Sequence, residues 1–268
     1  MKTDILVIGA GPVGLFTVFE AGILGLKCTL IDNLDKPGGQ CAELYPDKPI
    51  FDIPGVPYQT AQEHVDALLK QIEPFDYELI LNERVESMIE KKGVWEVTTN
   101  NGTKVESSNI FIAAGAGSFE PIKPNLECNY SNLENKKIFY SIKDKQLFKD
   151  KNVAIFGGGD SALDWTVELE KIGANVSLIH RRDAFRGAPD TEMAVRKLNE
   201  EGKIKLLTPY IIKDIKGTDD IEEIMLFNSE TKDESSINAD YILFFYGLNK
   251  KLGPINDWNL ELSGNKIK

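Results

Sequence analysis

The sequence has 268 residues, of which 42 % are hydrophobic and 27 % charged, and a formal net charge of −11 at pH 7. This composition is typical of a globular chain with room for two domains of ordinary size. The negative balance argues against nucleic acid as a partner, because phosphate binding needs clustered Lys and Arg. No apolar run approaches the roughly 20 residues that span a bilayer, so we expect no membrane partner.

The three cysteines, Cys28, Cys41 and Cys128, form no close pair. This spacing indicates a reducing compartment rather than a disulfide framework. The chain runs from Met1 directly into an apolar segment, which leaves no space for a signal peptide. We therefore expect a cytoplasmic protein, and we assign no metal ligands.

The first elements of the chain predict a β-α-β unit. Asp4–Ile8 is a short apolar run typical of a buried parallel strand. A helix from about Pro12 to Gly25 follows, and Cys28–Ile31 is the next strand, closed by Asp32. The pattern then predicts a helix over Ala61–Ile72 and short strands over Leu79–Leu81, Val85–Ile89, Trp95–Thr99, Lys104–Glu106 and Ile110–Ala114.

The same pattern begins again in the second half of the chain. Val153–Phe156 predicts a strand, Ser161–Ile172 a helix and Val176–Ile179 a second strand. Further on, we expect a helix over Thr191–Glu201 and strands over Lys205–Leu207, Ile224–Phe227 and Tyr241–Phe244. The segment around Pro121 and Pro124 and the lysine-rich Asn135–Lys151 are interpreted as the crossing between the halves. Internal duplication is therefore the main feature of the sequence.

Each copy contains a glycine-rich turn between its first strand and its helix. In the first copy Gly9, Gly11 and Gly14 form G-x-G-x-x-G. The first glycine permits a tight turn, the second lets the backbone approach a pyrophosphate, and the third lets the helix pack closely on the strand. The motif alone is a weak signal. Asp32 strengthens it, because a carboxylate at the end of the second strand can accept hydrogen bonds from ribose hydroxyls.

The second copy has Gly157, Gly159 and Ala162, the G-x-G-x-x-A variant. Asp32 follows Gly9 by 23 positions, and His180 follows Gly157 by 23 positions. The slot that holds a carboxylate in the first copy therefore holds a basic run in the second.

That basic run is His180-Arg181-Arg182, with Arg186 four residues further on. A carboxylate would repel a ribose 2′-phosphate, whereas an arginine pair would bind one through charge-assisted hydrogen bonds. The first copy should hold FAD or NAD, and the second NADP(H). The alternative is that the arginines form a solvated turn, but their register coincides with the ribose slot.

With these features the chain resembles the two-dinucleotide-fold flavoproteins, and among them the ferredoxin/flavodoxin–NADP⁺ reductases of the thioredoxin-reductase-like type. The residues that carry the resemblance are Gly38-Gly39-Gln40, Leu44-Tyr45-Pro46 with Phe51–Gly55, Ala113–Phe119, Gly157–Trp165, His180–Arg186, and Leu252–Ile255 with Trp258. The resemblance implies an α/β fold of two Rossmann-like dinucleotide-binding domains, with parallel sheets in a three-layer ββα/βαβ arrangement. We expect an FAD-binding domain over 1–118, an NADP(H)-binding domain over 119–246, and the start of a return connection over 247–268.

The resemblance also implies the cofactor-binding residues. Those toward FAD are Gly9, Gly11, Gly14, Asp32, Gln40, Tyr45, Val85 and Phe119. Those toward NADP(H) are Gly157, Gly159, Ser161, Arg181, Arg182 and Arg186. From the residues alone, the simpler interpretations are that Tyr45 is a packing residue and Val85 a strand-core residue, and Phe119 is equally a loop residue that shields the first sheet.

The activity that the resemblance implies is electron transfer between NADPH and ferredoxin or flavodoxin through FAD. Because the flavin carries the chemistry, we assign no catalytic side chain. The related disulfide reductases need a cysteine pair beside the flavin, but the position five after Cys41 is Pro46, and 138–151 contains no cysteine. The alternatives are a thioredoxin-reductase-like enzyme and a non-catalytic NADP-binding fragment or redox sensor. The resemblance further implies a homodimer.

Two further features are a lysine run that could bind a protein partner and an FAD-binding element of the family pattern that is missing from this sequence. An acidic electron carrier would dock on basic residues, for which the candidates are Lys136, Lys137, Lys143, Lys145, Lys149 and Lys151. A solvated face is the simpler interpretation of that run. The family pattern also has a third FAD element, a strand ending in Gly-Asp after the NADP domain, and this sequence contains no such element. We therefore expect weakened FAD retention by this chain.

Overall fold

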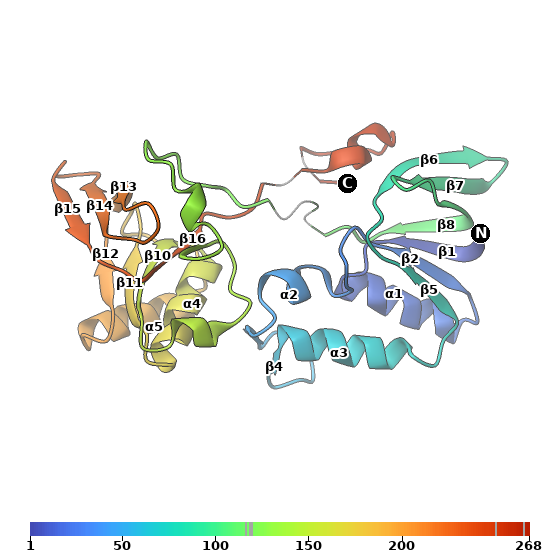
Figure 1. Ribbon diagram of the computed structural model, residues 1–268. Helices are drawn as coiled ribbons and strands as arrows, with labels where there is room; N and C mark the ends of the chain where they lie inside the picture. Colours follow the sequence, from blue (N-terminus) through green and yellow to red (C-terminus); the bar gives the residue numbers. More distant parts are fainter. Residues whose placement is uncertain (116, 118–119, 250, 265) are drawn as a thin grey trace. The chain divides into compact units, whose positions relative to one another are not determined.

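The structure is a computed structural model that describes residues 1–115, 117, 120–249, 251–264 and 266–268. The chain forms two compact units, which Figure 1 shows. Unit 1 consists of Met1–Glu120 and Asn249–Lys268, and unit 2 of Pro121–Leu248.

Unit 1 is built on a six-stranded sheet in the order β5-β2-β1-β8-β7-β6. The elements are β1 (Lys2–Ile8), α1 (Pro12–Ile23), β2 (Cys28–Ile31), α2 (Gly39–Leu44), β3 (Pro49–Ile50), β4 (Gln59–Thr60), α3 (Ala61–Ile72), β5 (Tyr77–Ile80), β6 (Val85–Lys91), β7 (Val94–Thr99) and β8 (Lys104–Ile112). The first four strands of the sheet order are parallel, and β8, β7 and β6 form an antiparallel meander.

Strand β8 corrects one prediction, because the two expected strands Lys104–Glu106 and Ile110–Ala114 are one continuous strand. Its residues 104–107 pair with β7 and its residues 106–112 with β1, so that the two pairings overlap. The polar residues between the two expected strands interrupted the apolar pattern. The Ser107 side chain is nevertheless 2 % exposed, because its hydroxyl donates to the carbonyl oxygen of Asp4 at 3.2 Å.

Both faces of this sheet are covered. On one face α1 and α3 pack against β1 and β2 around Leu15, Val65 and Leu30. On the other face Ile255 and Trp258, from the segment that contains the 3₁₀ helix η3 (Gly253–Asp257), pack onto the meander. Trp258 Nε1 also donates to the carbonyl oxygen of Glu86 at 3.1 Å. Ile255 and Trp258 therefore form part of the core of unit 1.

Unit 2 contains a five-stranded parallel sheet in the order β12-β11-β10-β16-β9 and an antiparallel sheet in the order β13-β14-β15. Its elements are η1 (Ser131–Leu133), β9 (Ile138–Phe139), η2 (Lys145–Phe148), β10 (Asn152–Gly157), α4 (Asp160–Lys171), β11 (Asn175–Ile179), α5 (Pro189–Glu200), β12 (Lys205–Leu207), β13 (Tyr210–Lys216), β14 (Glu223–Asn228), β15 (Glu234–Ile237) and β16 (Tyr241–Phe245).

Three strands of unit 2 were not predicted. The segment interpreted as a crossing contains β9, which extends the parallel sheet beside β16. Strand β13 shifts register between Ile212 and Asp214, which interrupts its alternation of apolar and polar residues. Strand β15 is polar at three of its four positions and pairs along one side with β14. The antiparallel sheet was therefore recognised at β14 alone.

The duplication extends to topology. When the edge strand β9 is left aside, the parallel strands of each unit follow the order third, second, first, fourth along the chain, namely β5-β2-β1-β8 and β12-β11-β10-β16. The register is also repeated, since Ile5 pairs with Cys28 and Phe156 with Ile179, an offset of 23 residues in both. This is the strand order of dinucleotide-binding sheets, whose ligands lie at the carboxyl ends of the strands where the order reverses. The predicted α/β class of two Rossmann-like domains is confirmed.

Helix α1 begins in contact with the turn that precedes it. A Cβ atom added to Gly14 would lie 1.9 Å from the carbonyl oxygen of Gly9, a backbone atom that cannot move aside. The third glycine of the motif therefore fixes how closely α1 approaches the end of β1.

We predict that Gly14→Ala lowers the free energy of unfolding by about 1–3 kcal/mol, as overpacking does, although alanine is the better helix former. Gly11→Ala is the matched control, because a Cβ at Gly11 would meet only the Cα of Gly39, at 3.8 Å. Urea denaturation of both variants measures the difference. Equal stability of the two variants would contradict the proposed close approach.

Candidate dinucleotide sites

The first glycine turn lies between β1 and α1, next to the end of β8. Gly9 has φ +107°, and a Cβ there would lie 2.4 Å from the carbonyl oxygen of Ala113. Gly9 and Gly14 are therefore required by packing. A Cβ on Gly11 would make only an ordinary contact, 3.8 Å from the Cα of Gly39, and no side chain caps the amides at the start of α1. An anion can approach this helix end as closely as the backbone allows.

Asp32 lies directly after β2 and is joined to this turn. Its Oδ2 accepts a hydrogen bond from the Ala10 amide at 2.6 Å, and its Oδ1 accepts one from the Leu34 amide at 2.9 Å. The residue is partly exposed. Each carboxylate oxygen has a further lone pair, so the fixed carboxylate can also accept from a ribose hydroxyl.

A second glycine pair packs against the first turn. The Gly38 amide donates to the carbonyl oxygen of Ala10 at 2.8 Å, and a Cβ on Gly39 would lie 3.0 Å from the Cα of Gly11. Gln40 follows in the first turn of α2, and its Nε2 would lie 3.7 Å from a Cβ on Gly115. The structure thus brings Gln40 to the same carboxyl edge of the sheet as the first glycine turn.

Of the other residues predicted to bind FAD, Tyr45 is partly buried at the end of α2 and Val85 is buried in the core. Tyr45 ends α2 with its ring partly buried, and burial, followed by the neighbouring Cys41, raises the pKa of its hydroxyl to about 12. The Val85 side chain is 4 % exposed and packs in the core beside Val97. Its side chain therefore lies in the packed interior. Phe119 lies outside the described residues.

The second glycine turn repeats this arrangement between β10 and α4. A Cβ on Gly157 would lie 2.7 Å from the carbonyl oxygen of Phe245, and one on Gly158 would lie 2.3 Å from the His180 ring. A Cβ on Gly159, in contrast, would meet nothing within 4 Å. Ser161 is exposed in the first turn of α4, whose amides have no side-chain cap. The middle glycine of the motif again leaves a clear approach to the backbone.

The loop after β11 carries the three predicted arginines. Arg181, Arg182 and Arg186 are exposed, and none of them forms an ion pair with a carboxylate of the described residues. The loop is attached to the glycine turn by its backbone, since the Arg186 amide donates to the carbonyl oxygen of Gly158 at 2.7 Å. The unpaired positive charge therefore lies next to the second turn.

Tyr246 lies next to the second turn and was not singled out from the sequence. The last residue of β16, Phe245, pairs with Gly157, so Tyr246 follows at the edge of the second turn. Its ring packs against Phe244 with centroids 5.5 Å apart, and the residue is 38 % exposed. The signal available in the sequence was an aromatic residue just after the apolar run that predicts the last strand.

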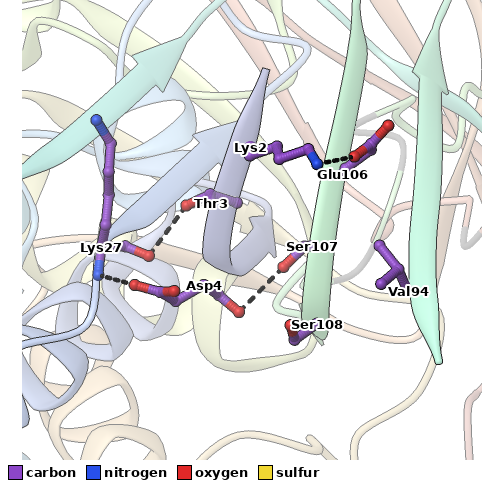
Figure 2. Close-up of a pocket in the computed structure, with 8 residues that line it drawn as sticks. All are labelled: Lys2, Thr3, Asp4, Lys27, Val94, Glu106, Ser107 and Ser108. Atoms are coloured by element: carbon purple, nitrogen blue, oxygen red, sulfur yellow. Dashed lines mark hydrogen bonds and ion pairs between the residues drawn. The ribbon is translucent and has the colours of Figure 1, made fainter.

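A separate hollow in unit 1, drawn in Figure 2, lies at the amino end of β1 and not at the glycine turns. Lys2 pairs with Glu106 at 3.2 Å, and Asp4 accepts from the Lys27 amide at 2.9 Å. Because these polar groups are paired with each other, they are poorly suited to hold a nucleotide.

Two cysteines are buried, and two lysines of the candidate docking run form ion pairs. Cys28 and Cys41 are buried, and burial raises the pKa of both thiols, that of Cys28 to about 11. Lys137 pairs with Asp220 at 2.9 Å and Lys145 with Glu168 at 3.6 Å. Part of the charge of the lysine run is therefore neutralised within unit 2.

Neither a membrane-spanning helix nor a metal-binding cluster occurs in the described part of the chain. Within it, no helix is long and apolar enough to cross a bilayer, and no group of three or more His, Cys, Asp and Glu side chains is placed to bind a metal ion.

The surroundings of His180 generate a prediction about pH. Burial, followed by the charges of Arg181, Arg182 and Arg186, lowers the pKa of this imidazole, whose ring stacks on Phe185 with centroids 5.2 Å apart. The stability that depends on the neutral ring is complete above the unfolded value of about 6.5 and is lost as the pH falls through the lowered pKa.

An NMR titration of the full chain measures this, with His180→Gln used to identify the ring signal. We expect a midpoint below about 6.5, the value of an unperturbed histidine. A midpoint at or above that value would contradict the described burial beside three arginines.

Comparison with known proteins identifies the family. The model of the pyridine nucleotide-disulphide oxidoreductase family matches residues 3–268. A ferredoxin–NADP reductase of Pelagibacter ubique is 49 % identical in an alignment of 270 residues that covers 100 % of this chain and 78 % of that protein. One of Wolbachia pipientis is 45 % identical in an alignment of 269 residues that covers 100 % of this chain and 79 % of that protein.

Solved structures show the same fold at low identity. The thioredoxin reductase of Lactococcus lactis has a TM-score of 0.80 at 21 % identity, over 97 % of this chain and 82 % of that one. The thioredoxin reductase of T. acidophilum has a TM-score of 0.82 at 19 % identity, over 98 % and 83 %. The chain belongs to the pyridine nucleotide-disulphide oxidoreductase family and, within it, to the ferredoxin–NADP reductases with the thioredoxin-reductase-like fold.

Proposed function

We propose that this chain is a flavoprotein oxidoreductase that transfers electrons between NADP(H) and ferredoxin, with FAD bound by unit 1 and NADP(H) by unit 2. The observation that carries the proposal is the contrast at one repeated position. The position directly after β2 in unit 1 is Asp32, whose carboxylate is fixed by the Ala10 amide. The corresponding position after β11 in unit 2 leads into Arg181 and Arg182, which are exposed and form no ion pair with a described carboxylate.

The first site fits a dinucleotide with a free ribose. The lack of a side chain at Gly11 and the uncapped start of α1 suit a pyrophosphate, and Asp32 is placed to accept hydrogen bonds from ribose hydroxyls. FAD, when bound, supplies the hydride acceptor and the electron donor of the reaction. From the family resemblance, Gln40 and Tyr45 contribute on the flavin side. Val85 contributes through its backbone, because its side chain is in the core.

The second site fits a dinucleotide with a 2′-phosphate. Gly159 and the uncapped start of α4, with Ser161 in its first turn, receive the pyrophosphate. Three guanidinium groups without carboxylate partners among the described residues can form bidentate, charge-assisted hydrogen bonds to the 2′-phosphate. A carboxylate in the same place would repel that phosphate. The two sites therefore select different nucleotides.

The acceptor proposed is an acidic one-electron carrier, ferredoxin or flavodoxin, and not a disulfide. The thiols of Cys28 and Cys41 are buried with raised pKa values, which keeps them protonated and disfavours thiolate chemistry. The exposed Lys136, Lys149 and Lys151 are available to such a carrier. We further propose that the enzyme is a cytoplasmic homodimer, as the family resemblance implies.

We predict that Arg181→Ala combined with Arg182→Ala raises KM for NADPH by ~10-fold or more and that for NADH by less than about 3-fold, because charge-assisted bonds to the 2′-phosphate are lost. Steady-state oxidation of each nucleotide by the FAD-loaded protein, with an excess of a one-electron acceptor to reoxidise the flavin, measures the ratio. Lys197→Ala, an exposed cation on α5, is the control and should leave both values unchanged. Equal loss for the two nucleotides would reject the assignment of unit 2.

We also predict that Gly159→Ala leaves stability unchanged while weakening nucleotide binding. The added methyl group meets no protein atom within 4 Å, so it occupies the space through which the pyrophosphate would approach. Thermal unfolding and calorimetric titration with NADP⁺ measure the two effects. Unchanged NADP⁺ affinity would show that the dinucleotide does not bind over this turn.

A further inference from the structure

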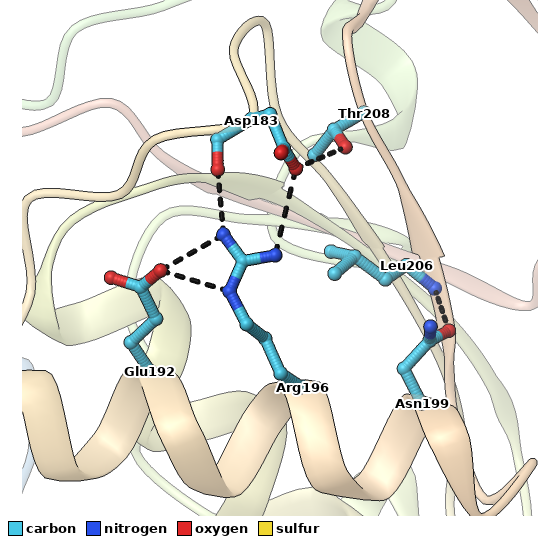
Figure 3. Close-up of polar contacts among 6 residues, drawn as sticks. All are labelled: Asp183, Glu192, Arg196, Asn199, Leu206 and Thr208. Atoms are coloured by element: carbon cyan, nitrogen blue, oxygen red, sulfur yellow. Dashed lines mark hydrogen bonds and ion pairs between the residues drawn. The ribbon is translucent and has the colours of Figure 1, made fainter.

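The loop that carries the three arginines also carries an acid. Asp183 follows Arg182 directly, and a carboxylate so close in sequence could pair with the arginines and neutralise them. In the structure it is held elsewhere. Its Oδ1 accepts a hydrogen bond from the Thr208 hydroxyl at 3.1 Å and lies 3.6 Å from Nη1 of Arg196. Figure 3 shows these contacts.

Arg196 reaches this loop from helix α5. Its Nη2 donates to the backbone carbonyl oxygen of Asp183 at 2.7 Å. Its Nε and Nη2 both lie 2.9 Å from Oε1 of Glu192, one turn earlier on the same helix (Figure 3). The guanidinium is thus fixed by Glu192 on its own helix and holds both the backbone and the carboxylate of Asp183.

The same guanidinium also lies on the aromatic part of the loop. Its carbon Cζ is 5.4 Å from the centre of the Phe185 ring, within cation–π range. Phe185 stacks on His180 with centroids 5.2 Å apart, and the His180 ring fills the space above Gly158. A continuous set of contacts therefore joins α5 to the second glycine turn.

The two kinds of arginine in this region differ in their partners. Arg196 has carboxylate partners, Glu192 and Asp183. Arg181, Arg182 and Arg186 form no ion pair with a described carboxylate. Arg196 thus pairs with the carboxylate of the loop, and the charges of the other three arginines are not neutralised by a described carboxylate. A lysine could not replace Arg196, since its contacts use several donors of one planar group.

We propose that Arg196 is a positioning residue for recognition of the 2′-phosphate. It holds Asp183 and Phe185, and so keeps the Asp183 carboxylate away from Arg181, Arg182 and Arg186. This inference rests on the function proposed above for unit 2. It adds that the preference for NADP(H) depends on a residue on α5 that does not itself contact the nucleotide.

The test uses the full 268-residue chain and two probes, adenosine 2′,5′-bisphosphate and AMP, titrated calorimetrically. Arg196→Met keeps the apolar stem but removes the donors. It should weaken the bisphosphate by ~10-fold and change AMP by less than about 2-fold, because only the 2′-phosphate interaction is lost. Arg196→Lys should restore little of the loss. Lys197→Met, the next residue on α5, is the matched control and should bind both probes normally.

A double variant separates the charge of Asp183 from a general loss of loop order. In Arg196→Met combined with Asp183→Asn, the competing charge is absent, so affinity for the bisphosphate should recover at least half of the loss on a logarithmic scale. Unchanged affinity in the single variant, or no recovery in the double variant, would overturn the proposal. Arg181→Ala with Arg182→Ala must also weaken the bisphosphate. If it does not, the proposed function of unit 2 fails, and the role of Arg196 fails with it.

Discussion

The close contact between each helix start and the strand before it is the constraint on which both sites depend. In unit 1 the backbone of Gly14 touches the carbonyl group of Gly9, and in unit 2 the methyl group of Ala162 fills the space beside Gly157. Larger side chains at these positions would push the helices away. Because the helices are held close, their uncapped amide ends face the carboxyl edge of the sheet, where an anion can be bound by the backbone.

On this shared geometry, the two units differ in the charge of one slot. The carboxylate of Asp32 is fixed to the first turn by the Ala10 amide, whereas the arginine loop of unit 2 is fixed to its turn by the Arg186 amide. The attachment is made by a side-chain carboxylate in unit 1 and by the backbone in unit 2, and the charge at the two positions is opposite. Under the proposed assignment, a repeated fold binds two related dinucleotides without exchanging them, because the sign of the charge at the ribose selects the nucleotide.

Much of the fold follows from local sequence patterns, because buried parallel strands and glycine turns have short-range signatures. The same patterns divided β8 in two, since Ser107 is polar but buried, and they missed β13 because its register shifts after Ile212. The predicted glycines and arginines lie at the two turns, although their contacts with nucleotides remain proposals. The contact of Arg196 with Asp183 had no sequence signature, because it depends on how α5 packs against a loop 13 residues earlier. Long-range packing of this kind is set by the tertiary structure.

A crystal structure of the chain with FAD and NADP⁺ would test the central claim most directly, namely that the charge of the ribose slot sorts the two nucleotides. The account predicts the 2′-phosphate of NADP⁺ within hydrogen-bonding distance of Arg181 and Arg182, and the adenosine ribose hydroxyls of FAD at Asp32. The contradicting result would be a 2′-phosphate bound in unit 1, or NADP⁺ bound in unit 2 with both arginines directed into solvent.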